Sequence, residues 1–159
     1  MPNDLINTDP IVAQNFFLEV DGSVVSLLSS VSGLDVEVEV VTLQQNGKDG
    51  KQQQIKTLGL HTKAPDISMT RMAPLDAVSD PLWKWFTDIR TKGMAGADRA
   101  SNRKNGSIVM YDTTGKEVGR FNFFNGWPSK ISTDQLSTES NDALKETITL
   151  TIERLERVK

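Results

Sequence analysis

The strongest constraint on the fold is a stretch near the C-terminus in which apolar and polar residues alternate one by one, from Leu144 to about Arg154. One face is apolar apart from a single carboxylate, and it comprises Leu144, Glu146, Ile148, Leu150 and Ile152. The other face carries Lys145, Thr147, Thr149 and Thr151. A period of two residues places successive side chains on opposite faces of a β-strand. The stretch is therefore predicted to be a two-faced strand, with one apolar face and one threonine-rich face.

The segment ahead of that strand, Asn125-Gly126-Trp127-Pro128-Ser129-Lys130, follows an aromatic strand and has no side chains suited to catalysis. Trp127 and Pro128 are predicted to form an apolar structural corner. A corner of this kind followed by a long two-faced strand is typical of a shell or assembly protein.

The remaining pattern is mostly strand with one helix. Strands are predicted at 15–20, 24–28, 34–43, 67–72, 107–111 and 117–124. The helix is predicted over 81–92, because Ser79 or Asp80 can cap it and Pro81 suits its first position. Trp85 lies on its apolar stripe and is expected in the core. The fold class is therefore mainly β, an antiparallel barrel or sandwich with one flanking helix.

Two adjacent segments differ sharply in character. In the first, Leu34, Val36, Val38 and Val40 alternate with the carboxylates Asp35, Glu37 and Glu39, so one face should be buried and the other wet. The second, residues 44–57, is polar and contains glycines, and it is predicted to be an exposed loop excursion. Residues 1–13 are predicted to be a loose N-terminal arm, and residues 14–159 a single domain.

Composition excludes several functions. The chain has 159 residues, no cysteine and a net charge of −3, so disulfides, thiolate catalysis and a freestanding basic nucleic-acid surface are not expected. His61 is the only histidine, and neither metal-ligand spacing nor a nucleophile elbow accompanies it. We expect no enzyme activity, cofactor or metal. The N-terminus lacks a secretory signal and no apolar run could span a membrane, which favours assembly in the cytoplasm.

The order of motifs resembles a known family. Phe17-Leu18-Glu19-Val20-Asp21-Gly22 is followed by Val31-Ser32-Gly33-Leu34-Asp35-Val36-Glu37, then by the helix with Trp83 and Trp85. The strand from Ser107 to Asp112, the Trp127-Pro128 segment and Glu146-Thr147-Ile148-Thr149-Leu150 complete the order. Together these resemble the tail tube proteins of contractile phage tails and the inner tube proteins of extracellular contractile injection systems. The type VI secretion tube protein is related.

This resemblance implies a ring-forming β-barrel subunit. Homo-hexamers would stack into a hollow tube inside a contractile sheath, with baseplate or initiator and terminator proteins at its ends. The cargo would be protein effectors, or DNA in a phage tail, and the particle could be released from the cell. Residues expected at a subunit interface or the lumen are Asp35, Glu37, Glu39, Gln44, Gln45, Lys48, Gln52, Gln53, Thr147, Thr149 and Thr151.

The sequence is also compatible with two other classes of protein. A small ligand- or carbohydrate-binding β-domain would also explain the strands and aromatic residues, and it would be a stable monomer. An enzyme that uses Asp or Glu is the weaker alternative, because no paired acid and base can be identified. The sequence does not distinguish a phage tail from an injection device, or a main tube subunit from a minor paralogue.

Overall fold

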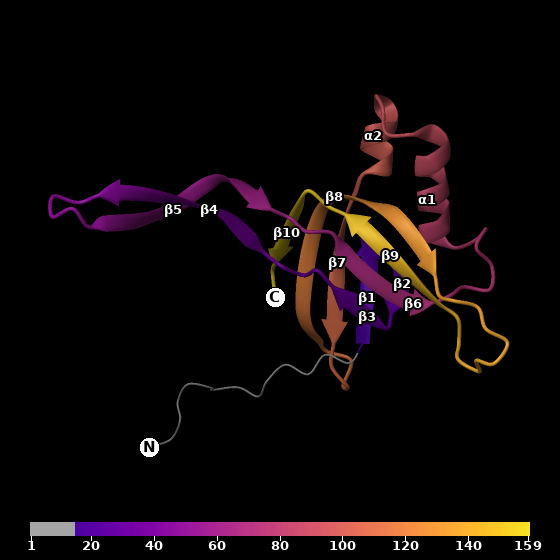
Figure 1. Cartoon of the computed structure of the whole chain (residues 1–159). Coiled ribbons are helices and arrows are strands. Elements are labelled where there is room, and N and C mark those ends of the chain that lie inside the picture. Colours follow the sequence, from indigo (N-terminus) through magenta and orange to yellow (C-terminus); the bar gives the residue numbers. More distant parts are fainter. Residues whose placement is uncertain (1–14) are drawn as a thin grey trace, which may run out of the picture.

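One antiparallel sheet dominates the chain, as the computed structural model in Figure 1 shows. The structure describes residues 15–159, so the loose N-terminal segment predicted over residues 1–13 lies outside the described residues. The order of the sheet is β2-β1-β7-β8-β9-β6-β3, with β10 paired to β8. Its strands are β1 (Asn15–Val20), β2 (Ser23–Leu28), β3 (Ser30–Ser32), β6 (Ile67–Met72), β7 (Lys104–Tyr111), β8 (Glu117–Thr133), β9 (Lys145–Thr151) and β10 (Arg154–Arg157). The prediction of a mainly β fold is confirmed.

The two end strands of this sheet do not pair with each other. The sheet is therefore open, whereas a barrel or sandwich was predicted. The end strands β2 and β3 are nevertheless consecutive along the chain, with only Ser29 between them. The Ser29 backbone N–H donates to the carbonyl of Thr70 on β6 at 2.8 Å. The chain itself therefore brings the two ends of the sheet together.

The predicted alternation in the C-terminal strand matches the burial of β9. Ile148 and Leu150 are fully buried, while the alternating Thr147 and Thr149 are only partly buried. Ile148 pairs with Met69 of β6 on one side and with Ile131 of β8 on the other. The buried core around them comprises Leu18, Val20, Leu28, Ile67, Met69, Leu82, Trp85, Ile108, Phe123, Ile148, Leu150, Ile152 and Leu155.

The predicted Trp-Pro corner is instead part of a continuous strand. Trp127 and Pro128 lie inside β8, at the point where this long strand changes partner. β7 pairs with β8 as far as Gly126, and β9 pairs with it from Trp127 onward. A register shift follows Pro128, which lacks the N–H that a regular ladder needs. The segment therefore joins two halves of the sheet without reversing the chain.

The predicted helix is present as α1 (Pro81–Lys92), capped by Asp80, whose side chain accepts from the Trp83 backbone N–H. Trp85 is buried, and its Nε1 donates to the carbonyl of Asn102 at 2.6 Å. Asn102 ends the short helix α2 (Ala97–Asn102), which packs beside α1 (Figure 1). No helix within residues 15–159 is long and apolar enough to cross a membrane.

A two-stranded hairpin projects away from this body (Figure 1). It consists of β4 (Glu37–Asn46) and β5 (Gln52–Lys63), which pair with each other and form a separate sheet. We call residues 37–63 the arm. The prediction of a loop over residues 44–57 is wrong, because all of this segment except a short turn around residues 47–51 is strand.

Candidate assembly surface

The arm carries apolar side chains on both of its faces. On one face Val40 lies opposite Leu58, and these two side chains are 58% and 70% exposed. On the other face Leu43 lies opposite Ile55, with 53% and 47% exposure. The prediction that this strand buries one face is therefore wrong for the single chain, because the body lies beside the base of the arm and covers neither face.

The outer part of the arm is polar. Cross-strand neighbours there are amide pairs, Gln44 with Gln54 and Gln45 with Gln53. The predicted interface residues Gln44, Gln45, Lys48, Gln52 and Gln53 are all exposed and all lie in this part. An isolated two-stranded hairpin is at best marginally stable in water. Exposed apolar side chains on both faces of such a hairpin are typical of a surface that contacts another macromolecule.

The predicted carboxylate row lies at the base of the arm. Asp35 and Glu37 are exposed, whereas Glu39 is partly buried. The side chain of Glu39 passes over Gly59 of β5, where a β-carbon would lie 2.6 Å from the Glu39 Cγ. Gly59 thus leaves room for a carboxylate at the irregularity where the hairpin register shifts. Glu37 and Glu39 therefore belong to the arm and Asp35 directly precedes it, while the predicted threonines belong to the main sheet.

A hydroxyl-rich face lies on the opposite side of the main sheet from the core. Thr147, Thr149 and Thr151 of β9 are partly buried there. Thr147 lies opposite Thr70 of β6 and Ser132 of β8, and the Thr70 and Thr147 hydroxyls are 3.5 Å apart. Thr149 lies opposite Ser68. This polar face spans three neighbouring strands and is separate from the arm.

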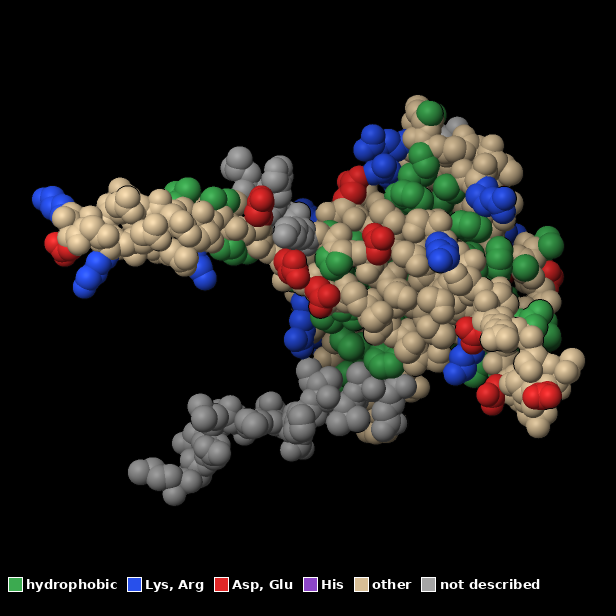
Figure 2. All heavy atoms as spheres, viewed as in Figure 1, with side chains coloured by type: hydrophobic (Ala, Val, Ile, Leu, Met, Phe, Trp, Pro, Cys, Tyr) green, Lys and Arg blue, Asp and Glu red, His purple; other side chains and the backbone are tan. Residues whose placement is uncertain are grey.

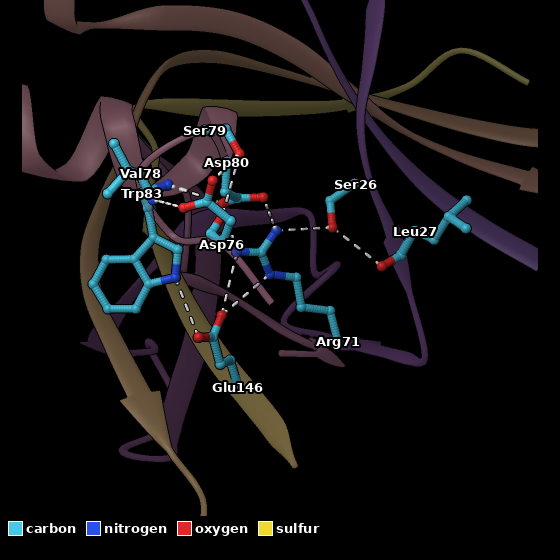
Figure 3. A network of polar contacts seen from close by, with 9 residues as sticks. All are labelled: Ser26, Leu27, Arg71, Asp76, Val78, Ser79, Asp80, Trp83 and Glu146. Carbon is cyan, nitrogen blue, oxygen red and sulfur yellow. Dashed lines mark hydrogen bonds and ion pairs between the residues drawn. The ribbon is translucent and has the colours of Figure 1, made fainter. Parts of the chain in front are cut away.

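A buried ion network fixes helix α1 to the sheet (Figure 3). The guanidinium of Arg71 on β6 donates to both carboxylate oxygens of Asp80, at 2.9 and 2.7 Å. It also donates through Nε and Nη2 to Glu146 Oε2 on β9, at 3.3 and 3.2 Å. Trp83 Nε1 donates to the other Glu146 oxygen at 3.2 Å. Two strands and the start of the helix therefore meet at one arginine.

The charge state of Asp80 reflects two opposing effects. Burial disfavours the charged carboxylate and acts to raise its pKa. Hydrogen bonds from Arg71 and from the Trp83 backbone N–H outweigh burial, so the pKa of Asp80 lies below its usual range. Asp80 therefore stays ionised and holds both Arg71 and the first turn of α1.

Sequence reasoning missed this network, although one signal pointed to it. Glu146 stands on the otherwise apolar face of the C-terminal strand, and a buried carboxylate requires a cation or several donors. Its partner, Arg71, is recognisable only once β6 is known to pair with β9, because Arg71 lies directly opposite Glu146.

The described side chains include no group of three or more His, Cys, Asp or Glu residues that could hold a metal ion. The side chain of His61, considered above as a candidate, lies outside the described part of β5. The arm and the hydroxyl-rich face are the candidate functional surfaces, because the chain itself leaves their side chains exposed or only partly buried.

A known protein family matches most of the chain. The family of T4-like virus tail tube protein gp19 matches residues 12–156 of the chain. No curated protein sequence matches the chain significantly.

Solved structures with a similar fold include chains from the anti-feeding prophage and from an extracellular contractile injection system. A chain in the tube-terminating cap of the anti-feeding prophage is 20% identical with a TM-score of 0.74, and the match covers 98% of this chain and 95% of that one. A chain in the extended sheath–tube complex of the PVC extracellular contractile injection system is 20% identical with a TM-score of 0.72, covering 99% and 97%. A chain in the 6-fold symmetrised anti-feeding prophage baseplate is 14% identical with a TM-score of 0.69, covering 95% and 97%.

Proposed function

We propose that this chain, which belongs to the T4-like virus tail tube protein family and is a structural subunit of a tail tube, assembles into hexameric rings that stack into a hollow tube. The observation that carries the proposal is the projecting arm with apolar pairs on both faces, Val40 with Leu58 and Leu43 with Ile55. The body of the same chain covers neither face, which supports other copies as the partners that cover them. The arm is then the element that joins subunits.

Ring formation follows from the kind of contact that the arm makes. An arm that reaches a different surface on the next copy gives a head-to-tail contact, which closes into a ring or extends as a filament. Six copies per ring agree with the fold's presence in a 6-fold symmetrised baseplate. The arm would become fully ordered only when a neighbouring subunit or ring covers it.

The hydroxyl-rich face is proposed as the wall of the lumen or of a seam between subunits. Thr147, Thr149 and Thr151 present hydroxyl groups without charge, so they bury between subunits at lower cost than charged side chains do. Asp35, Glu37 and Glu39 are proposed to lie at a ring seam, because the arm emerges there. A ring structure with all three carboxylates on the outer wall, away from any seam, would overturn this assignment.

We further propose the partners of such a tube. A contractile sheath would surround it, and baseplate and terminator proteins would hold its two ends, as the sources of the related folds suggest. The role is structural and not catalytic. The cargo would be protein effectors in an injection device or DNA in a phage tail, and the particle would assemble in the cytoplasm before release.

The direct test is negative-stain electron microscopy of the purified protein, with light scattering for mass. We expect six-fold rings or hollow tubes. The matched variant removes Lys48 to Gln53 and so shortens only the tip of the arm. This deletion should abolish tubes while the circular dichroism of the body is preserved. A monomer that stays dispersed over a wide range of concentration and salt would contradict the proposal and favour a monomeric binding domain.

A further inference from the structure

Exposed large apolar side chains gather at two opposite ends of the molecule. One group belongs to the arm and its base and comprises Val36, Val38, Val40, Val41, Leu43, Ile55 and Leu58. The other comprises Met72, Leu75, Val78, Leu136 and Leu144. Among the described residues, Val24, Leu27 and Val158 are the remaining members of this exposed class. Figure 1 shows the arm on one side of the body and the loops that carry the second group on the other side.

Apart from Met72, the last residue of β6, the second group lies on two loops that the sheet places side by side. Residues 73–80 follow β6, and residues 134–144 connect β8 to β9. The Ala73 backbone N–H donates to the carbonyl of Leu144 at 2.9 Å, which joins the two loops. We call residues 72–80 and 134–144 the loop end. Leu75 is fully exposed and Val78 is 81% exposed, so this end has an apolar surface that the chain leaves uncovered.

The loop end also contains a hollow that could receive side chains of a partner. It lies within the 134–144 loop and is lined by Leu136, Ala143 and Leu144 together with Asp134 and Asp142. Apolar and acidic side chains thus share one depression. A partner that fits it should carry apolar side chains next to positive charge.

The charges of the two ends are opposite. Residues 134–144 contain Asp134, Glu139 and Asp142 and no lysine or arginine. Asp76 adds a further carboxylate, and hydrogen bonds from the Ser79 hydroxyl and the Val78 backbone N–H lower its pKa. Two cations adjoin the loop end along the chain: Lys145 at the start of β9, and Arg71, which is paired with Asp80 and Glu146.

The outer arm, by contrast, is basic. Lys48, Lys51 and Lys56 stand there against the single carboxylate of Asp49. Figure 2 shows blue side chains spread along the arm, with red ones at its tip and base, and mostly red side chains on the loops at the opposite end.

We propose that the arm of one copy docks on the loop end of a second copy, with Leu43 or Leu58 covering the apolar loop residues and the arm lysines facing Asp134, Glu139 and Asp142. This inference rests on the proposed tube function and names the surface that receives the arm. It commits to a second copy as the occupant, because the same chain supplies both complementary surfaces. Since the two surfaces differ and lie at opposite ends, the contact is head-to-tail and repeats from copy to copy.

The first test uses site-specific cross-linking, which is clean because the chain has no native cysteine. A Lys51→Cys variant is mixed with a size-tagged Ser137→Cys variant and treated with a short bismaleimide under assembly conditions. The control mixture pairs Lys51→Cys with a size-tagged Thr113→Cys, which places the second thiol on the exposed β7–β8 turn outside the loop end. We expect mixed dimers in the first mixture at about tenfold the yield of the control.

The cross-linking result separates the inference from the proposed function when the same samples are imaged. Tubes with cross-links to Ser137→Cys support both. Tubes with equal yields in the two mixtures, or with cross-links only to Thr113→Cys, overturn the inference and leave the tube function standing. Absence of both tubes and mixed dimers contradicts both.

A charge exchange tests the electrostatic part independently. Lys48→Glu, Lys51→Glu and Lys56→Glu together place like charges opposite the loop end, which costs several kcal/mol across an interface. The assembled fraction should then fall by about tenfold or more, since each 1.4 kcal/mol is a factor of ten. Asp134→Lys, Glu139→Lys and Asp142→Lys should have the same effect, and a chain with all six changes should assemble again. If the chain with all six substitutions is folded by circular dichroism but does not regain assembly, the proposed pairing is contradicted.

Discussion

The body and the arm contain strands with the same alternating pattern but with opposite outcomes for their apolar faces. In β9 of the body, Ile148 and Leu150 are completely buried by neighbouring strands and the core. In β4 of the arm, Val38 and Val40 are 52% and 58% exposed. Alternation therefore shows which side chains share a face, but not which chain covers that face. The body covers its apolar face with its own residues, whereas the apolar side chains of the arm stay exposed in the single chain.

The largest loss of stability in the body is expected when its buried cation, Arg71, is removed. Arg71→Ala leaves Asp80 and Glu146 buried without their counter-ion, and losing one partner of a buried ion pair costs about 3–5 kcal/mol. We expect that loss in the free energy of unfolding, measured with urea. The matched control is Arg120→Ala, which removes partly exposed ion pairs to Glu19 and Glu117 and should cost about 1 kcal/mol or less. Equal losses in the two variants would contradict the structural role of Arg71.

A second large effect is expected at the packing of helix α1. Trp85→Ala should lower the free energy of unfolding by about 3–5 kcal/mol, because it removes a large buried side chain. Trp85→Phe keeps most of the packing and loses the hydrogen bond to the Asn102 carbonyl, so its cost should be about 1–3 kcal/mol. Chemical denaturation of both variants measures the difference, and a Phe variant as unstable as the Ala variant would refute the packing argument.

A smaller, pH-dependent effect is expected from Asp80. Its folded-state pKa is lowered, so its contribution to stability is present above the unfolded pKa of about 4 and is lost as the pH falls through the lower folded value. In Asp80→Asn this part of the acid dependence should be missing. Urea unfolding at pH 7 and near pH 3 measures it, with Asp88→Asn on the exposed side of α1 as the control. An unchanged acid dependence in Asp80→Asn would contradict the assignment.

The smallest effect on the stability of the monomer is expected in the arm. Leu43→Ser with Ile55→Ser alters side chains that the body does not cover, so unfolding of the body should change by about 0.5 kcal/mol or less. Assembly into tubes, measured by sedimentation, should nevertheless be lost. Leu150→Ser is the matched change in β9 and should destabilise the monomer by several kcal/mol. If the arm variant still formed tubes normally, the distinction between body and arm would fail.

The sequence predicted the elements that local signals define. The alternating C-terminal strand and helix α1, with Asp80 as cap and Pro81 at its start, were both anticipated, because spacing and capping act over a few residues. The segment 44–57 was not, because its glutamines and lysines are exposed on both faces and show no period, so a polar strand has the composition of a loop. Cross-strand pairing, which the sequence does not reveal, makes it a strand.

The sequence predicts some residues of the candidate surfaces but not how they are grouped, because the grouping depends on strand pairing. The glutamines and lysine of the outer arm and the threonines of β9 were named from the sequence, but their separation onto two different surfaces depends on the strand order. The carboxylates Asp35, Glu37 and Glu39 were expected on the wet face of a packed strand, whereas the structure places them at the base of the arm. The loop end was not anticipated at all, because its two loops meet only through the pairing of β6, β8 and β9.

Hydrogen–deuterium exchange of the free subunit and of the assembled tube, measured peptide by peptide, tests the central claim most directly. The account predicts that amides of residues 37–63 exchange rapidly in the free subunit and become strongly protected in the tube, while amides of β6, β8 and β9 are protected in both. An arm that is already as protected as the body in the free subunit, or that stays unprotected in the tube, would contradict it.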